Sequence, residues 1–463
     1  MTTTQNPSVA GHALSIPEIL RSVLESADDS TTLLAAIRVN EQWFDCGTDV
    51  VWGRRPSLPI SALAGVANHR QQLYASKIRQ LEFNGDDEIA FHERFRHLHF
   101  TNLRAVSLDA YRLRSGSKYY IKQYLQPSLE RFSFYGGDLD DELLEYIRTT
   151  CWRLSIIQIM APGPMVTAPA FFRFISGCKC LKNISLHHKM RHLLTDHLLL
   201  HLAGRPSLRS LAFDQVCSRQ ILAQISNDLS APFKDLQVLH TAASSTAAPL
   251  LAQLVGQLTT LVLTVADSDA PVMHTLASLR QLKHLTLSFA ADTELSPKDI
   301  LSLKPLCGLE SLRIGPAEGE SSVTVSLLES GFADSHFDEL CSALPNLRDL
   351  FFHVQATLSL AALESLSKHC PSLMNCEMMP VFDTQMQEWE AREDVLFPNL
   401  RCLEIGGFES PTMPAKQLAA LLRKHCPHMT ELYFIAGNQY TDDVDNAYAL
   451  LLDKEEEDGN DGG

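Results

Sequence analysis

One pattern of six residues recurs along most of this chain. Its first, fourth and sixth residues are apolar, and the residues between them vary. Fourteen such units begin at Ile78, Leu103, Leu129, Leu154, Leu181, Leu208, Leu236, Leu258, Leu282, Leu309, Leu347, Leu373, Leu400 and Met429. Successive starts are 22 to 29 residues apart, except for the 38 residues between Leu309 and Leu347. Such a repeat restricts the architecture strongly, because each unit must bury its apolar face against the next.

The length and pattern of each unit are typical of a leucine-rich repeat, whose period is 20 to 29 residues. The first, fourth and sixth residues of a unit should point inward and the alternate residues outward, as the two-residue period of a strand requires. Stretches such as residues 139–148, 361–368 and 417–424 carry apolar residues at helical spacing ahead of a strand. The sequence therefore predicts an α/β fold: a short helical module followed by a curved leucine-rich-repeat solenoid with parallel strands inside and helices outside.

The expected domains follow from these patterns and from changes in composition. We expect a disordered N-terminus at residues 1–13, a helical module at 14–56, a linker or cap at 57–77, the solenoid of about 14 units at 78–452, and an acidic disordered tail at 453–463. A proline-rich loop is expected at residues 161–170, and an insertion of roughly ten residues within 316–334 accounts for the 38-residue spacing. These two loops are either functional or ordinary solvated excursions.

Charge and composition exclude several classes of function. The net charge of −16 and the pI near 5.5 argue against broad nucleic-acid binding, although a local basic patch stays open. The polar start of the chain is not a signal peptide, and no apolar run reaches the length of a membrane span. Eleven cysteines then indicate reduced thiols. We therefore expect a protein of the cytoplasm or nucleus, with neither nucleic acid nor membrane as a partner.

Cysteines and histidines give no convincing metal site. Cys151, Cys178, Cys370 and Cys426 each lie three residues before the first apolar residue of a unit, where a small thiol would end a helix and pack tightly. His188 and His192, like His197 and His201, are four residues apart, but neither pair has a glutamate after its first histidine or an evident third ligand. We predict no metal, no cofactor and no catalytic residues.

Residues 14–56 differ from the repeats. Apolar residues at helical spacing follow Pro17, which suits the first turn of a helix. A second apolar set extends from Leu33 to Phe44, and a last group ends at Trp52. About forty residues with so many large apolar side chains cannot bury them all, so a leftover apolar face suggests a partner.

This segment resembles the F-box. The family pattern is matched by Ile16-Pro17-Glu18-Ile19-Leu20, by Leu33-Leu34, by the run from Arg38 to Phe44 (RVNEQWF), and by Val51-Trp52. Ile16 and Val51 are conservative departures from it. Together with the cysteine-phased repeats, the module resembles a fungal-type F-box/leucine-rich-repeat protein.

The resemblance implies a non-enzymatic substrate receptor of a Skp/cullin/F-box (SCF) ubiquitin ligase, acting in ubiquitin-dependent protein degradation. The F-box would bind a Skp-type adaptor and, through it, a cullin, while the repeats hold a protein substrate. The implied adaptor-binding residues are Ile16, Pro17, Ile19, Leu20, Leu24, Leu33, Leu34, Val39 and Trp43. The alternative for Pro17, Leu20, Val39 and Trp43 is that they pack only in the module's own core.

Outward positions of the last units suggest where a substrate lies. Asp349, Glu377, Glu404 and Glu431 are expected to form an acidic column on the inner face, with Phe351 and Tyr433 as aromatic anchors beside it. A basic segment of a substrate would relieve the repulsion within such a column. Ordinary solvated carboxylates in an acidic protein are the alternative interpretation.

Two other functions stay open from the sequence. The first is an interaction scaffold that uses the F-box and the repeats outside a ligase, in transcription or trafficking. The second is a GTPase-activating leucine-rich-repeat protein, but that class lacks the run from Asn40 to Trp43 and usually keeps an asparagine at the ninth position of each unit. No unit here has asparagine or cysteine at that position.

Overall fold

The computed structural model describes residues 13–27, 29–53, 60–84, 89–111, 120–319, 322–328, 331–383, 387–409 and 412–460. The chain divides into two compact units, Met1–Leu198 and Leu199–Gly463. The predicted N-terminal disordered segment lies outside the described residues except for Ala13.

The first unit begins with three helices, α2 (Pro17–Glu25), α3 (Ser30–Ala36) and α4 (Glu41–Gly53). Pro17 begins α2, and the Asp29 carboxylate caps α3 by accepting from the backbone N–H groups of Thr31 and Thr32. The helices share a small core, formed by Leu20, Leu24, Leu33, Ala36, Cys46 and Val50. The module thus has its own apolar centre.

The rest of the first unit alternates strands and helices. The segment expected as a linker forms a 3₁₀-helix η1 (Ile60–Gly65) and α5 (Asn68–Ala75). The strands pair in parallel and in chain order: β1 (Gln80–Asn84), β2 (Ala105–Tyr111), β3 (Arg131–Gly137), β4 (Ile156–Met160) and β5 (Asn183–His187). Between them lie α6 (Ile89–Arg94), η2 (Tyr120–Tyr124), α7 (Asp141–Thr150) and α8 (Ala168–Gly177), and α9 (Asp196–Ala203) contains the boundary with the second unit.

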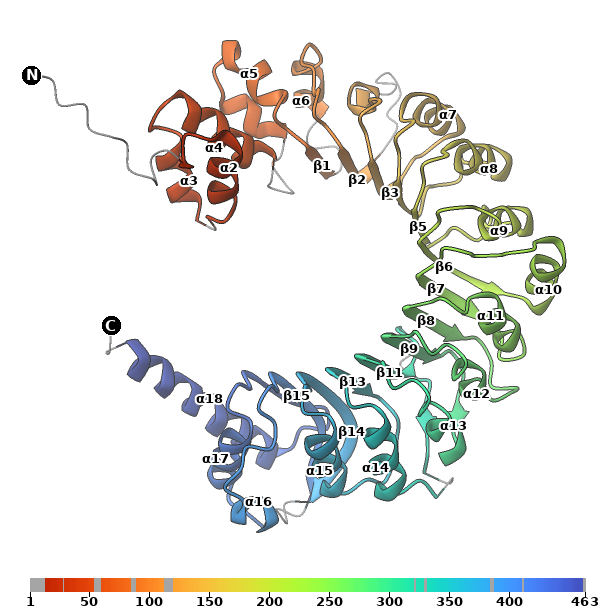
Figure 1. Cartoon of the computed structure of the whole chain (residues 1–463), viewed down its shortest axis with the longest axis vertical. Helices are drawn as coiled ribbons and strands as arrows, with labels where there is room; N and C mark the ends of the chain where they lie inside the picture. The colour runs from red at the N-terminus through yellow and green to blue at the C-terminus, as the bar shows by residue number, and fades with distance from the viewer. Residues whose placement is uncertain are drawn as a thin grey trace, which may run out of the picture. The chain divides into compact units, whose positions relative to one another are not determined.

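The second unit continues the same alternation (Figure 1). Its sheet has the order β6 (Ser210–Cys217), β7 (Val238–Ala243), β8 (Thr260–Val265), β9 (His284–Phe289), β11 (Ser311–Pro316), β13 (Asp349–Phe352), β14 (Asn375–Asp383), β15 (Cys402–Glu409) and β16 (Glu431–Phe434). The helices are α10 (Arg219–Asp228), α11 (Ala248–Leu254), α12 (Met273–Leu276), α13 (Pro297–Leu301), α14 (Asp334–Ala343), α15 (Leu360–His369), α16 (Gln387–Ala391), α17 (Ala415–His425) and α18 (Gln439–Asn460). Within each unit the helices cover one side of the sheet.

These elements confirm the predicted α/β leucine-rich-repeat fold. Each of the fourteen predicted units contains one strand of the 14-stranded parallel order. Side chains alternate as expected: in β8, Leu261, Leu263 and Val265 are buried, and the residues between them are partly exposed. The four phased cysteines are buried, and each ends a helix as its C-terminal cap. Burial raises the pKa of Cys151 to about 12, which suits packing rather than reactivity.

Three local predictions differ from the structure. The loop expected at residues 161–170 ends earlier, because Thr167 caps α8 and Pro169 fits its first turn. The insertion near residue 325 contains β12 (Val325–Ser326), which pairs with β10 (Thr293–Glu294). The tail predicted to be disordered is helical as far as Asn460, because α18 continues through it. No helix in the described part of the chain is both long and apolar enough to cross a membrane.

Candidate interaction surfaces

The N-terminal module exposes an unusual share of large apolar side chains. Five of the fifteen exposed large hydrophobic residues in the described chain lie within residues 16–39. We call them the module's apolar surface: Ile16 (40% exposed), Ile19 (42%), Val23 (47%), Leu34 (49%) and Val39 (60%). Ile19 and Val23 are four residues apart on α2 and therefore project from one side of that helix. A small domain rarely leaves such side chains in water without a partner.

The nine residues predicted to bind an adaptor differ in how far their side chains are exposed. Ile16, Pro17, Ile19, Leu34 and Val39 are exposed. Leu20, Leu24 and Leu33 are 0%, 3% and 6% exposed and lie in the module's own core, so they would support an adaptor interface from behind. Trp43 is partly buried and packs against that core.

Sequence reasoning missed Val23 as a surface residue and did not separate it from the buried Leu20 and Leu24. All three belong to one apolar run, in which hydrophobicity alone does not separate the two faces. The signal that separates them is helical phase: Leu20 and Leu24 are one turn apart on the inner side, and Ile19 and Val23 on the outer side.

Side-chain contacts fix the module to the segment that follows it within the first unit. The Lys77 ammonium lies 2.8 Å from the Asp49 carboxylate and donates to the Asp45 carbonyl oxygen at 3.0 Å. The Lys77 side chain is only 10% exposed, so this ion pair is poorly screened by water. The rings of Trp52 and Tyr74 stack with centroids 4.9 Å apart. The module is therefore held by side-chain contacts against the α5 segment that leads into the first repeat.

In the second unit, the strand register corrects the predicted acidic column. Asp349 pairs with Asn375, which pairs with Cys402, which pairs with Glu431. These paired residues form one row across the sheet, and a second row lies two residues further along each strand. From β11 to β16 it contains Arg313, Phe351, Glu377, Glu404 and Tyr433. The four acidic residues therefore occupy two rows, because two of them are at the third position of their unit and two at the fifth.

Of the four acidic residues, only Glu377 and Glu404 are direct neighbours in a row. Glu377 is engaged by His353, whose Nε2 lies 2.9 Å from its carboxylate. Within the described chain, Glu404 has no hydrogen-bond or ion-pair partner. In the other row, Asn375 Nδ2 donates to Asp349 at 2.6 Å. Free negative charge is therefore concentrated toward the last strands.

Aromatic side chains flank Glu377 and Glu404 in the row that runs from Arg313 to Tyr433. The Arg313 guanidinium stacks over the Phe351 ring, 4.1 Å from its centroid. Tyr433 on β16 is 53% exposed and pairs in register with Glu404. Burial and then the Glu431 carboxylate raise the pKa of Cys402 to about 11. We call Glu377, Glu404, Glu431 and Tyr433 the acidic strand face.

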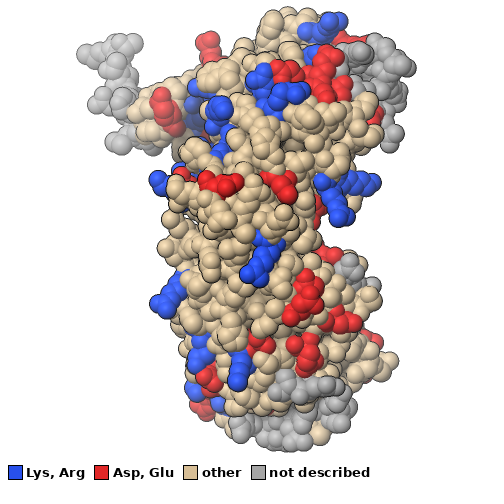
Figure 2. Space-filling model, turned by 90° about the vertical axis from the view of Figure 1, so that its right-hand side faces the viewer, with Lys and Arg blue, Asp and Glu red and all other residues tan. Residues whose placement is uncertain are grey.

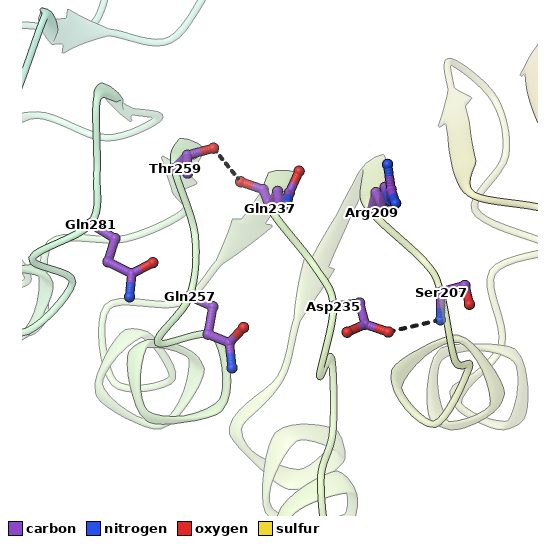
Figure 3. Close-up of a pocket in the computed structure, with 7 residues that line it drawn as sticks. All are labelled: Ser207, Arg209, Asp235, Gln237, Gln257, Thr259 and Gln281. Atoms are coloured by element: carbon purple, nitrogen blue, oxygen red, sulfur yellow. Dashed lines mark hydrogen bonds between the residues drawn. The ribbon is translucent and has the colours of Figure 1, made fainter.

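A third feature is a cavity of about 320 Å³ beside the starts of β6, β7 and β8 (Figure 3). It is lined by Ser207, Arg209, Asp235, Gln237, Gln257, Thr259 and Gln281. The Ser207 N–H donates to Asp235 at 3.2 Å, and the Thr259 hydroxyl donates to the Gln237 carbonyl at 3.2 Å. Six of these seven residues are exposed, and three of them are glutamines.

The described residues offer no cluster of three or more His, Cys, Asp or Glu side chains for a metal ion. Figure 2 shows one face of the molecule, on which basic and acidic side chains are interspersed with broad uncharged areas.

Comparisons with known proteins give matches among solved structures. No protein-family model matches the sequence, and no curated protein matches it. Similar solved structures include an internalin from Listeria monocytogenes, with 13% identity over 95% of this chain and 100% of that one, at a TM-score of 0.38. A chain of the Rad7 and Elc1 complex in yeast is 13% identical over 94% of this chain and 97% of that one, at a TM-score of 0.39.

A third similar structure is the TLR13–ssRNA13 complex, with 14% identity over 79% of this chain and 51% of that one, at a TM-score of 0.43. All three TM-scores are below 0.5, and no argument is based on these likenesses. Function has to be argued from the surfaces themselves.

Proposed function

We propose that this chain is the substrate-recognition subunit of an SCF ubiquitin ligase, whose module binds a Skp-type adaptor and whose repeats bind a protein substrate. The observation that supports the first half is the module's apolar surface, which lies on a segment that resembles the F-box. Its side chains are 40% to 60% exposed. Covering them with a partner would remove apolar area from water at about 25 cal/mol per Å².

The contacts between the module and the α5 segment, which leads into the first repeat, support the second half. A receptor must present its substrate at a fixed position relative to the adaptor. The Asp49–Lys77 ion pair and the Trp52–Tyr74 stack provide such a connection within the first unit. The chain itself would supply proximity and orientation, and other subunits the chemistry.

The test is co-purification of the full chain with a Skp-type adaptor and a cullin. We expect Ile19→Glu/Val39→Glu to abolish capture of both partners, because charges replace the exposed apolar contacts. Leu450→Glu/Val216→Glu is the matched control, since both side chains are equally exposed but lie far along the chain. Leu20→Ala is not suitable here, because it removes a core residue and would test folding.

Three results are informative. Capture of adaptor and cullin that only the module variant abolishes supports the ligase receptor. Capture of the adaptor without a cullin favours an interaction scaffold in transcription or trafficking. A wild-type chain that binds no adaptor overturns the proposal.

For the substrate, we propose that a basic segment binds the acidic strand face, with cationic side chains at Glu404 and Glu431 and an apolar contact on Tyr433. A labelled lysine-rich peptide with one tyrosine is the probe. Glu377→Lys/Glu404→Lys should weaken its binding, while Glu393→Lys/Asp445→Lys changes net charge equally on exposed positions elsewhere. Equal binding by the two variants would contradict this site.

A further inference from the structure

A second charged surface, opposite in sign, lies in the first unit. Residues 151–195 contain six cations, Arg153, Arg173, Lys179, Lys182, Lys189 and Arg191, and no Asp or Glu. The whole chain has 39 Lys and Arg against 55 Asp and Glu. A stretch of this length without a carboxylate is therefore a strong local departure from the protein's composition.

Three of these cations lie at the same edge of two adjacent repeats. Arg153 comes just before β4, and Lys179 and Lys182 come just before β5. The backbone N–H of Lys182 donates to the Ser155 carbonyl at 2.8 Å, so the two chain segments run side by side where the strands begin. Neighbouring parallel strands are about 5 Å apart. We call Trp152, Arg153, Lys179 and Lys182 the cationic edge.

The cations of this edge are not neutralised within the described chain. All three side chains are exposed, and none has a carboxylate partner there. One repeat earlier the same edge is different, because Arg104 forms an ion pair with Glu130. Lys122 is likewise paired with Glu142 at 3.1 Å. The cations of the cationic edge therefore lie without an ion-pair partner in the stretch, residues 151–195, that contains no Asp or Glu.

An aromatic side chain completes the surface. Trp152 is 58% exposed, although tryptophan is the largest side chain that a protein can leave in water. The Arg153 guanidinium lies 5.1 Å from the ring centroid and covers one side of the indole. Tryptophan and arginine are the residues most enriched at the energetic centres of protein interfaces.

We infer that the cationic edge binds an Asp- or Glu-rich segment of a partner protein. Carboxylates of the segment would pair with Arg153, Lys179 and Lys182, and an apolar side chain between them would pack on the free side of Trp152. This inference does not depend on the adaptor, since the surface lies outside the module.

Two features favour a protein segment over nucleic acid. The net charge of −16 repels a long polyanion, whereas a short acidic segment meets only the local field. Single-stranded nucleic acid needs a series of aromatic platforms for successive bases. This edge has one tryptophan, and Arg153 already covers part of it.

The experiment measures binding of labelled peptides to the full chain by fluorescence anisotropy at increasing salt. One probe is an oligoglutamate and the second has the same length with a central leucine. The variant is Arg153→Glu/Lys179→Glu/Lys182→Glu. The control, Arg219→Glu/Lys298→Glu/Lys416→Glu, makes the same charge change at exposed positions of the second unit. Circular dichroism of each variant verifies folding.

We expect both peptides to bind the wild type, with affinity that falls as salt rises, and the first variant to lose at least about tenfold in affinity while the control loses much less. Trp152→Ala should weaken the leucine-containing peptide and leave the oligoglutamate unchanged. Equal losses in the two charge variants, or no binding by the wild type, would overturn the inference. Tighter binding of an oligothymidine of equal charge would overturn the assignment to a protein partner.

Discussion

The Nε2 atom of His425 lies 2.8 Å from the backbone carbonyl oxygen of Trp389, and both side chains are almost completely buried. The other ring nitrogen of His425 lies 3.0 Å from the Asp394 carbonyl oxygen. One imidazole on α17 thus joins the segment that contains α16 to the repeat that follows it. Trp389 also packs edge-on against the same imidazole, with centroids 5.8 Å apart.

His425→Ala should therefore lower the free energy of unfolding of the second unit by about 2–4 kcal/mol, since it removes buried contacts and the N–H that the imidazole donates to one of these carbonyl oxygens. Urea denaturation followed by tryptophan fluorescence measures it. His428→Ala, an exposed histidine three residues later, should change stability by less than about 0.5 kcal/mol. Similar losses in both variants would contradict this account.

Gly137→Ala should destabilise the first unit by more than about 2 kcal/mol. Gly137 has a φ of 123°, and a Cβ atom there would meet the Tyr111 carbonyl oxygen at 1.8 Å. Gly136→Ala is the comparison, because its φ is also positive but nothing lies within 4 Å of its Cβ position. Thermal unfolding should show the larger loss for Gly137→Ala, and the reverse order would be inconsistent with the structure.

Leu20→Ala and Val39→Ala should separate stability from binding in the module. Leu20 is fully buried, so its truncation should cost about 2–4 kcal/mol of stability. Val39 is 60% exposed, so its truncation should cost little stability but weaken adaptor binding. Unfolding and adaptor capture would be measured on both variants. A stable Leu20→Ala chain would show that the module core differs from the one described.

Asp267→Ala should produce a pH-dependent loss of stability. Ser245 is fully buried and donates two hydrogen bonds to the Asp267 carboxylate, one from its hydroxyl and one from its backbone N–H at 3.1 Å. The bond from the hydroxyl is the main cause that lowers the pKa of Asp267. The carboxyl therefore binds protons more weakly when folded than when unfolded, where its pKa is about 3.9. Its stabilisation is present above that value and disappears as the pH falls through the lower folded pKa.

At pH 7 we expect Asp267→Ala to lose about 1 kcal/mol relative to the wild type, with the difference shrinking below pH 4. Denaturant titrations at several pH values measure it. Asp269→Ala is the matched control, because only the backbone of Asp269 contacts Asp267. A difference between Asp267→Ala and the wild type that persists unchanged in acid would refute the linkage.

Glu404→Lys should stabilise the second unit by several tenths of a kcal/mol. Glu404 lies opposite Glu377 on the neighbouring strand, and like charges in this arrangement repel, whereas a lysine would attract. Glu393→Lys, with the same charge change at an exposed position of a loop, should have a smaller effect. Added salt should reduce the gain. A loss of stability at Glu404→Lys would mean that the two rows are assigned wrongly.

The repeat pattern predicted the strands well because burial alone selects which residues of a strand are apolar. The acidic residues were grouped into one column although Asp349 is at the third position of its unit and Glu377 at the fifth, and the strand pairing places these positions in different rows. In the module, Ile19 and Leu20 are similarly hydrophobic, and helical phase separates the exposed one from the buried one.

Surface charge was the least predictable feature. The cations of the cationic edge are visible in the sequence, but only the structure shows that Arg104 is neutralised by Glu130 while Arg153 is not. The acidic tail was expected to be disordered from its composition, yet α18 begins before it and continues through it. Helix propagation from a packed start outweighs the local propensity in that case.

The last strand, β16, pairs with β15 on one side, and α18 packs beside it against α17. The Tyr448 hydroxyl of α18 donates to the Met429 carbonyl at 2.9 Å, just ahead of that strand. A chain shortened before α18 would leave one row of backbone donors and acceptors without cover, and such a row is a template for another strand. Truncation there should thus promote self-association of the shortened chain, and size-exclusion chromatography would detect species larger than those of the full chain.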